Sequence, residues 1–145
     1  MKIEKRIADA KHYGDKRSTK DIKYIVIQNI TNKPVSHYNI INGEAIQIIP
    51  DDHIGNSVSG PRLNRRGYLH GVCTKYNSVS IGVPCKLSDS DKQMCFNLIM
   101  TIKQRYKIND DDIIRQMDVT GEMDPETWHD SDSWNKDIKN KLIDI

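Results

Sequence analysis

The sequence has few aromatic residues, no strong charge of one sign and no long apolar run. Only 6% of its 145 residues are aromatic, and 22 basic residues against 20 acidic ones leave a net charge of +2. No apolar run approaches the roughly 18 residues that span a bilayer, so we expect no membrane association. A nearly balanced charge gives no reason to expect a nucleic-acid polymer as a partner. The charged N-terminus has no apolar stretch behind it and does not resemble a secretory signal.

Cysteine is also scarce. The three cysteines, Cys73, Cys85 and Cys95, are odd in number and form no C-x-x-C pair. This pattern indicates reduced thiols in a cytoplasm and argues against a disulfide framework. No base is predicted near Cys85, so we expect a buried thiol there rather than a nucleophile.

The chain contains enough hydrophobic sequence for one folded domain. Its 37% hydrophobic and 29% charged residues are an ordinary balance for a globular protein, and no repeat or linker divides it. We therefore predict a single domain over residues 1–145, of which residues 1–20 form a polar N-terminal extension.

Hydrophobic periodicity predicts an α/β fold. Apolar, β-branched stretches indicate strands over residues 22–28, 35–41, 44–49, 78–85 and 113–117. Apolar residues at helical spacing indicate one helix that ends near residue 106 and a final helix marked by Trp134, Ile138 and Leu142. This order of elements predicts a mixed central β-sheet flanked by helices.

Two local signals sharpen this pattern. Asn42-Gly43 lies between two predicted strands, and both residues accept the positive φ that a tight hairpin turn requires. Ser88 and Asp91 have the spacing of a capping box, in which each side chain binds the other residue's backbone N–H. We therefore predict a hairpin at Asn42-Gly43 and a helix that begins after Ser88.

Several segments also match a known pattern in order and spacing. They are KDIKYIVI at residues 20–27, VSHY at 35–38, GEAIQIIPD at 43–51, NSVSIG at 77–82, DVTG at 118–121 and WNK at 134–136. Together these segments resemble the zinc-dependent N-acetylmuramoyl-L-alanine amidases of phage endolysins and bacterial autolysins. The resemblance covers nearly the whole chain and implies an amidase-like domain.

The resemblance implies a zinc site, and this sequence departs from it. In such amidases three protein ligands hold a zinc ion that activates a water. Gln28 and Gln116 stand at the two histidine positions, Asp124 stands at the third ligand position, and Pro84 replaces the acid. Two amides and one carboxylate bind zinc far more weakly than two imidazoles with a thiolate or carboxylate. The resemblance therefore implies a degenerate site with no catalytic residue, no metal ligand and no cofactor.

The groove of this degenerate site can still bind a ligand. By the resemblance, Gln28, Asn29, Gln116 and Asp124 are expected in it, and His37 is expected in its wall. Amide side chains can both donate and accept hydrogen bonds. These residues are our candidate ligand-binding set.

Arginines are expected to add positive charge to the groove. Arg115 precedes Gln116, and a loop expected to border the groove contains Arg62, Arg65 and Arg66. Guanidinium groups bind phosphate or carboxylate through paired hydrogen bonds. A solvated loop that keeps the protein soluble is the alternative interpretation.

Three functions remain open at this point. In the first, the inactive groove binds and sequesters a small anionic ligand, such as a nucleotide-like signalling molecule. In the second, the fold serves as a regulator that binds a protein partner, and in the third it binds muramyl-peptide fragments or keeps residual amidase activity. The sequence shows neither a cell-wall-binding module nor a signal. We therefore expect a cytoplasmic protein, which includes a phage-encoded protein in its host's cytoplasm, rather than a wall-degrading lysin.

Overall fold

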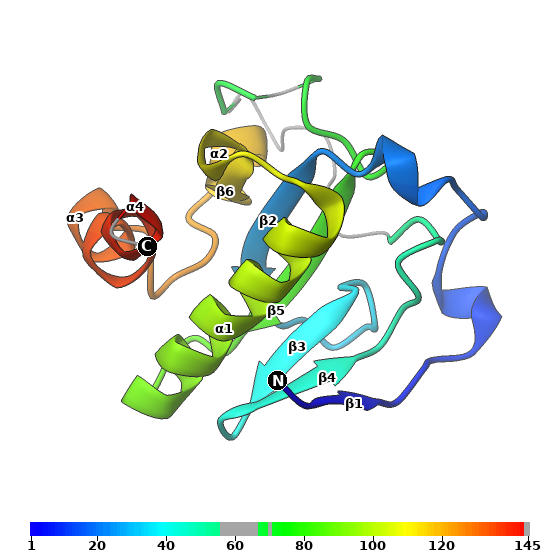
Figure 1. Ribbon diagram of the computed structural model, residues 1–145, viewed down its shortest axis with the longest axis horizontal. Coiled ribbons are helices and arrows are strands. Elements are labelled where there is room, and N and C mark those ends of the chain that lie inside the picture. The colour runs from blue at the N-terminus through cyan, green and yellow to red at the C-terminus, as the bar shows by residue number, and fades with distance from the viewer. Residues whose placement is uncertain (56–66, 70, 144–145) are drawn as a thin grey trace.

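The computed structural model describes residues 1–55, 67–69 and 71–143, and it confirms the predicted mixed sheet flanked by helices (Figure 1). The strands are β1 (Ile3–Lys5), β2 (Tyr24–Asn29), β3 (Tyr38–Ile41), β4 (Glu44–Gln47), β5 (Ser78–Val83) and β6 (Ile113–Arg115). The α-helices are α1 (Asp89–Tyr106), α2 (Met117–Thr120), α3 (Ser131–Trp134) and α4 (Asn140–Ile143). Single 3₁₀ turns lie at Ala10–His12, Thr19–Asp21 and Asp110–Asp112. Across these ranges no helix combines the length and apolarity that a membrane crossing needs.

The sheet is mixed because one pair of its strands is antiparallel. The six strands of the described residues follow the order β1-β4-β3-β5-β2-β6. β2 runs parallel to both of its neighbours, β5 and β6, and β5 runs parallel to β3. β3 and β4 are antiparallel, and the turn between them has φ of 51° at Asn42 and 74° at Gly43. This confirms the predicted hairpin.

The two faces of the sheet bury different side chains. Successive residues of a strand point to opposite faces, so Ile25 and Ile27 of β2 pack into the main core beneath α1. Val26 packs on the other face, in a smaller cluster with Cys73, Ile114 and Val119. Gln28 alternates with Ile27 and therefore shares the face of Val26.

α1 begins and ends as the sequence predicts. The side chain of Ser88 accepts a hydrogen bond from the Asp91 N–H, and the Asp91 carboxylate accepts one from the Ser88 N–H, each at 3.1 Å. The helix ends at Tyr106, and the next residue, Lys107, adopts a left-handed conformation with φ of 55°. Its apolar face packs on the sheet through Cys95, Leu98, Ile99 and Ile102.

The C-terminal helical segment also packs into the main core. A π-helical turn over Asn135–Lys139 joins α3 to α4, so the predicted final helix is present but wider in its middle turn. The rings of Trp128 and Trp134 lie 5.6 Å apart. Ile138 and Leu142 are buried in the same core.

The structure differs from the predictions at the N-terminus and at one cysteine. Residues 3–5 are part of the sheet as edge strand β1, because Ile3 pairs with Ala45 and packs against the main core. A strand of three residues is too short to give a detectable period.

Cys85 is exposed, and not buried as expected, because β5 ends at Val83 and the chain turns outward. All three cysteines are free thiols, as predicted.

Asp91 should contribute more to stability than its neighbour Asp89. Besides the Ser88 N–H, the buried Asp91 carboxylate accepts a hydrogen bond from the Gly43 N–H at 2.7 Å and so ties α1 to the β3–β4 turn. Asp91→Ala should lower the free energy of unfolding by on the order of 2 kcal/mol, since two part-buried backbone N–H groups, those of Ser88 and Gly43, lose a charged acceptor. Asp89→Ala is the control, because Asp89 is exposed in the same helical turn. Urea unfolding of both variants measures the difference, and equal losses would contradict the assigned role.

Candidate functional site

The candidate site lies at the edge of the sheet where the parallel strands end. β2, β5 and β6 run in the same direction, so the residues that follow them meet at one edge. The Gln116 N–H donates to the Ile27 carbonyl at 2.8 Å, and the Met117 N–H donates to the Asp124 carbonyl at 2.7 Å. The structure thus brings together Gln28, Gln116 and Asp124, which the sequence analysis placed in one groove.

Gln28 is buried and only half satisfied. Its side chain is 3% exposed, and its Nε2 donates to the Ser36 hydroxyl at 2.7 Å. Its Oε1 has no hydrogen-bond partner among the described residues. If the amide were turned over, the serine would bind the oxygen and leave the nitrogen without a partner. In either orientation one polar atom of Gln28 remains for a ligand or a water to satisfy.

A second buried amide lies beside Gln28, and sequence reasoning missed it. Asn39 of β3 and Gln28 of β2 both pair in register with Gly82 of β5, one from each side. A Cβ on Gly82 would lie 2.3 Å from Asn39 Oδ1 and 3.1 Å from Ser36 Oγ, so only glycine leaves space for these side chains. Asn39 Oδ1 is also buried, with no hydrogen-bond partner in the described part of the chain. An asparagine within an otherwise apolar strand was the signal that could have found it.

Asn29 and Asp124 hold the edge of the site together. Asp124 Oδ1 accepts a hydrogen bond from the Asn29 N–H at 2.6 Å. The Asn29 side chain in turn accepts one from the Glu126 N–H at 3.0 Å. These two residues fix the segment around Asp124 against the end of β2, so part of the hydrogen-bonding capacity of the Asp124 carboxylate is used in the fold.

Gln28, Gln116 and Asp124, at the positions that the resemblance to amidases assigns to zinc ligands, do not fit a zinc ion. Zinc sites in proteins are built from thiolate, imidazole and carboxylate ligands. Here two neutral amides accompany one carboxylate, and the Gln28 amide and the Asp124 carboxylate each already make an internal hydrogen bond. Within residues 1–55, 67–69 and 71–143, no group of three or more His, Cys, Asp or Glu side chains is placed to hold a metal ion.

Neither of the two residues that follow β5 is a ready general acid or nucleophile. Pro84 follows β5 directly and has no titratable group. The next residue, Cys85, has an exposed thiol whose pKa is raised by its hydrogen bond to Glu126. A raised pKa leaves less of the thiolate that would act as a nucleophile.

Of the four arginines expected in the groove, the structure describes only Arg115. Arg62, Arg65 and Arg66 lie outside the described residues. Arg115 is buried, and its guanidinium forms an ion pair with Asp118 at 3.3 Å and donates to the Trp128 carbonyl at 3.1 Å. This corrects the expectation that Arg115 offers free charge to a ligand, because its neighbours in the C-terminal segment already compensate that charge.

His37 is a structural residue of the wall. Ser80 N–H donates to its Nδ1 at 3.2 Å, so Nε2 carries the proton and donates to the His53 carbonyl at 2.8 Å. Burial, with a smaller contribution from the nearby Arg17, lowers the pKa of His37 to about 4. The imidazole is therefore neutral at ordinary pH.

Two lysines and a histidine that the sequence analysis did not select line a cavity beside the connection between β2 and β3. Lys11, His12 and Lys33 line a cavity of about 550 Å³ together with Pro34 and Val35. Lys33 precedes Ser36, the partner of Gln28, by three residues. Positive charge thus lies beside the segment that leads from β2 to β3.

Comparison with solved structures identifies proteins of the same fold. The chain is 18% identical to PlyL over 98% of its own length and 97% of that chain, with a TM-score of 0.74. It is 17% identical to the catalytic domain of PlyG over 99% of its own length and 94% of that chain, with a TM-score of 0.75. It is 16% identical to the N-acetylmuramoyl-L-alanine amidase LysC from Clostridium intestinale over 86% of its own length and 89% of that chain, with a TM-score of 0.62. No protein-family model and no curated sequence matches the chain. At these identities the likeness establishes the fold and leaves the activity open.

The purified protein should carry no stoichiometric zinc, and a chelator should leave its melting temperature unchanged. Replacing both amides, Gln28→His with Gln116→His, should create a zinc site with Asp124 and make the melting temperature sensitive to chelator, since metal that binds only the folded state stabilises it. Elemental analysis and thermal melts with and without EDTA measure both effects. The single variant Gln28→His is the control, and about one zinc per wild-type chain by elemental analysis would contradict the prediction.

Stability should fall as the pH falls from 6.5 towards 4, in part because of His37. The unfolded imidazole has a pKa near 6.5 and the folded one a pKa of about 4, so between these values the unfolded state binds the extra proton. His37→Gln should therefore flatten the pH dependence of the unfolding free energy by up to about 1.4 kcal/mol per pH unit in this window. His129→Gln, at a histidine outside this network, should leave the slope unchanged. Urea unfolding at several pH values tests this, and an unaltered slope in His37→Gln would refute it.

Proposed function

We propose that this protein is a catalytically inactive amidase-fold protein that binds and sequesters a small anionic ligand, such as a nucleotide-like signalling molecule. The observation that carries the proposal is the buried Gln28 amide, which has one polar atom left unpaired by the described residues and which the resemblance places at a zinc-ligand position. On this proposal the groove recognises a ligand by hydrogen bonds and needs no cofactor.

Loss of hydrolysis follows from the chemistry of the residues at this edge. Amide hydrolysis in this fold needs a polarising metal and a group that transfers a proton. The amides of Gln28 and Gln116 cannot supply the first, and Pro84 cannot supply the second. Several replacements at matched positions of an intact fold support a binding role better than a variant mechanism.

The unpaired amides support a ligand that contains hydrogen-bond donors. A buried polar atom without a partner costs about 1–3 kcal/mol of stability, so native proteins retain few of them. Gln28 Oε1 and Asn39 Oδ1 are two such acceptors near the same glycine of β5. The edge of a nucleobase presents N–H donors that match amide oxygens, as the bidentate contacts of Gln and Asn with bases illustrate.

The charge near the site supports an anionic group on that ligand. Lys11, His12 and Lys33 line a cavity beside the β2–β3 connection. Arg62, Arg65 and Arg66 lie in a segment that the resemblance to amidases places along the groove. On our proposal these side chains bind the phosphate or carboxylate while the amides bind the donor-bearing part.

Two other functions have observations in their favour. The fold similarity to the amidase LysC supports a binder of peptidoglycan fragments, or an enzyme with residual activity. The exposed side chains of Tyr68, Val72 and Tyr76 support a regulator that docks on a protein partner. The ligand experiment below separates these functions.

The proposal predicts that a nucleotide panel binds the wild-type protein and that groove variants weaken binding. Gln28→Met should reduce affinity by at least about tenfold, because it keeps the side-chain volume and removes the hydrogen-bonding amide. Arg65→Ala and Arg66→Ala should each reduce affinity by about tenfold or more without lowering the melting temperature. Arg6→Ala is the matched control, because Arg6 pairs with Glu4 beyond the far edge of the sheet.

Calorimetric titration of nucleotides and of muramyl peptides measures these effects, and release of peptide stems from peptidoglycan measures hydrolysis. Selective binding of muramyl peptides would replace the nucleotide proposal with the peptidoglycan one. Peptide release by the wild-type protein would show that the fold is still catalytic. If neither panel binds, the protein-partner function takes its place.

A further inference from the structure

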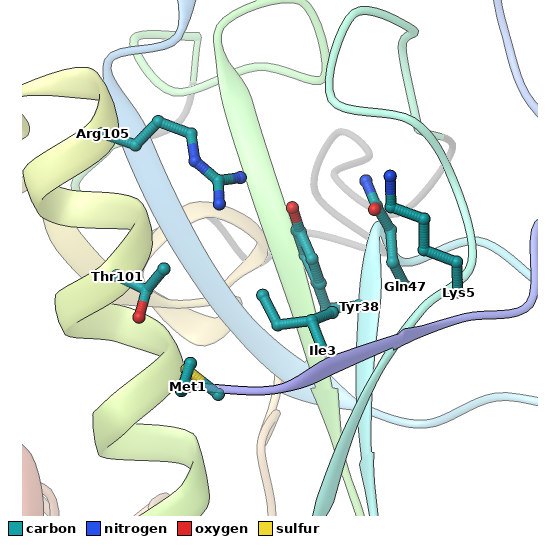
Figure 2. A pocket seen from close by; sticks show the side chains of 7 residues that line it. All are labelled: Met1, Ile3, Lys5, Tyr38, Gln47, Thr101 and Arg105. Atoms are coloured by element: carbon teal, nitrogen blue, oxygen red, sulfur yellow. The ribbon is translucent and has the colours of Figure 1, made fainter.

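A second cavity lies on the opposite face of the sheet, between α1 and the β1–β4 edge. It has a volume of about 480 Å³ and is lined by Met1, Ile3, Lys5, Tyr38, Gln47, Thr101 and Arg105 (Figure 2). Tyr38 belongs to the main core beneath α1, whereas Gln28 alternates onto the other face. This cavity is therefore distinct from the groove described above, and its volume falls within the usual range of small-molecule sites.

The register of the sheet divides the cavity into a polar end and an apolar end. Lys5 of β1 pairs with Gln47 of β4, which pairs with Tyr38 of β3, so these side chains form one row on the same face. Two residues earlier on β1, Ile3 forms the next row with Ala45. From the helix side, Thr101 and Arg105 are one turn apart and face the same cavity.

Two cationic side chains, Arg105 and Lys5, line the polar end of the cavity. Figure 2 shows the Arg105 guanidinium and the Lys5 amine on opposite sides of the Tyr38 hydroxyl. Within the described chain Lys5 makes no ion pair, and Arg105 uses one N–H group on Asp51 at 3.3 Å. A guanidinium has five N–H donors, so Arg105 retains donors for a second acceptor.

The acidic side chains near this end are already engaged. The Asp51 carboxylate accepts hydrogen bonds from Tyr38 at 2.8 Å and from Tyr106, in addition to its ion pair with Arg105. Glu4 alternates to the other face of β1 and pairs with Arg6 at 3.1 Å. No carboxylate lines the cavity itself in the described structure, and because Asp51 already pairs with Arg105, the polar end keeps one uncompensated positive charge, that of Lys5.

We propose that this cavity is a binding site for a small amphipathic organic anion, with its carboxylate between Arg105 and Lys5 and its apolar body along Ile3 and Met1. An anion there accepts hydrogen bonds from the Lys5 amine and from the Arg105 N–H groups that Asp51 leaves unused. The Gln47 amide lies in the same row and adds a neutral polar group. The apolar end removes the ligand's hydrocarbon from water, which contributes in proportion to the area buried.

Octanoate is the probe, and octanol and octylamine are its neutral and cationic counterparts of equal chain length. Titration calorimetry with the full chain should detect saturable binding of octanoate and much weaker binding of the other two. Lys5→Gln and Arg105→Gln should each weaken octanoate binding by about tenfold, since each removes a charge-assisted hydrogen bond. Thr101→Trp should abolish binding by filling the cavity, whatever the charge.

Lys2→Gln is the matched control. Lys2 is exposed and alternates with Ile3, so the substitution removes the same charge from the other face of the N-terminal segment. It should leave octanoate affinity unchanged, and the melting temperature of each variant verifies that it is folded. The proposal is overturned if octanoate does not bind at millimolar concentration, if octanol binds equally well, or if Lys2→Gln weakens binding as much as Lys5→Gln.

Discussion

The parallel pairing of β2 with β5 on one side and β6 on the other determines where the chemistry of this protein lies. Because the three strands run the same way, the residues that follow them meet at one edge of the sheet. Gln28 and Gln116 are thereby brought together from distant parts of the chain. The hydrogen bond from the Asn29 N–H to Asp124 adds the third residue to the same edge.

The side chains at this edge of the sheet, rather than the fold, determine which chemistry the edge can support. The same architecture is found in the amidase LysC, yet at this edge two amides and a proline occupy the positions that the resemblance assigns to zinc ligands and an acid. The Ser36 hydroxyl satisfies one polar atom of Gln28, and Gly82 leaves space for the Asn39 amide. Our proposal of ligand recognition at this edge rests on buried amides that keep unused hydrogen-bonding capacity.

Although the whole chain has a net charge of only +2, positively charged side chains gather in two separate regions. One lies near the β2–β3 connection, where Lys11 and Lys33 line a cavity. The other lies beneath α1, where Arg105 and Lys5 face each other across Tyr38. Charge that is balanced over the whole chain can still be concentrated locally, and local potentials are what attract ligands.

The sequence by itself determined strands β2 to β6, the Asn42-Gly43 turn and the capped start of α1, because each of these depends on neighbouring residues and a regular period. The resemblance to amidases also placed Gln28, Gln116 and Asp124 in one groove. Only the tertiary structure decided that Ile3–Lys5 joins the sheet, that Asp118 neutralises Arg115 and that Cys85 is exposed. It likewise decided that Lys5 and Arg105 share a cavity. The physical reason is that burial and ion pairing depend on which distant segments pack together, and no local period in the chain records that choice.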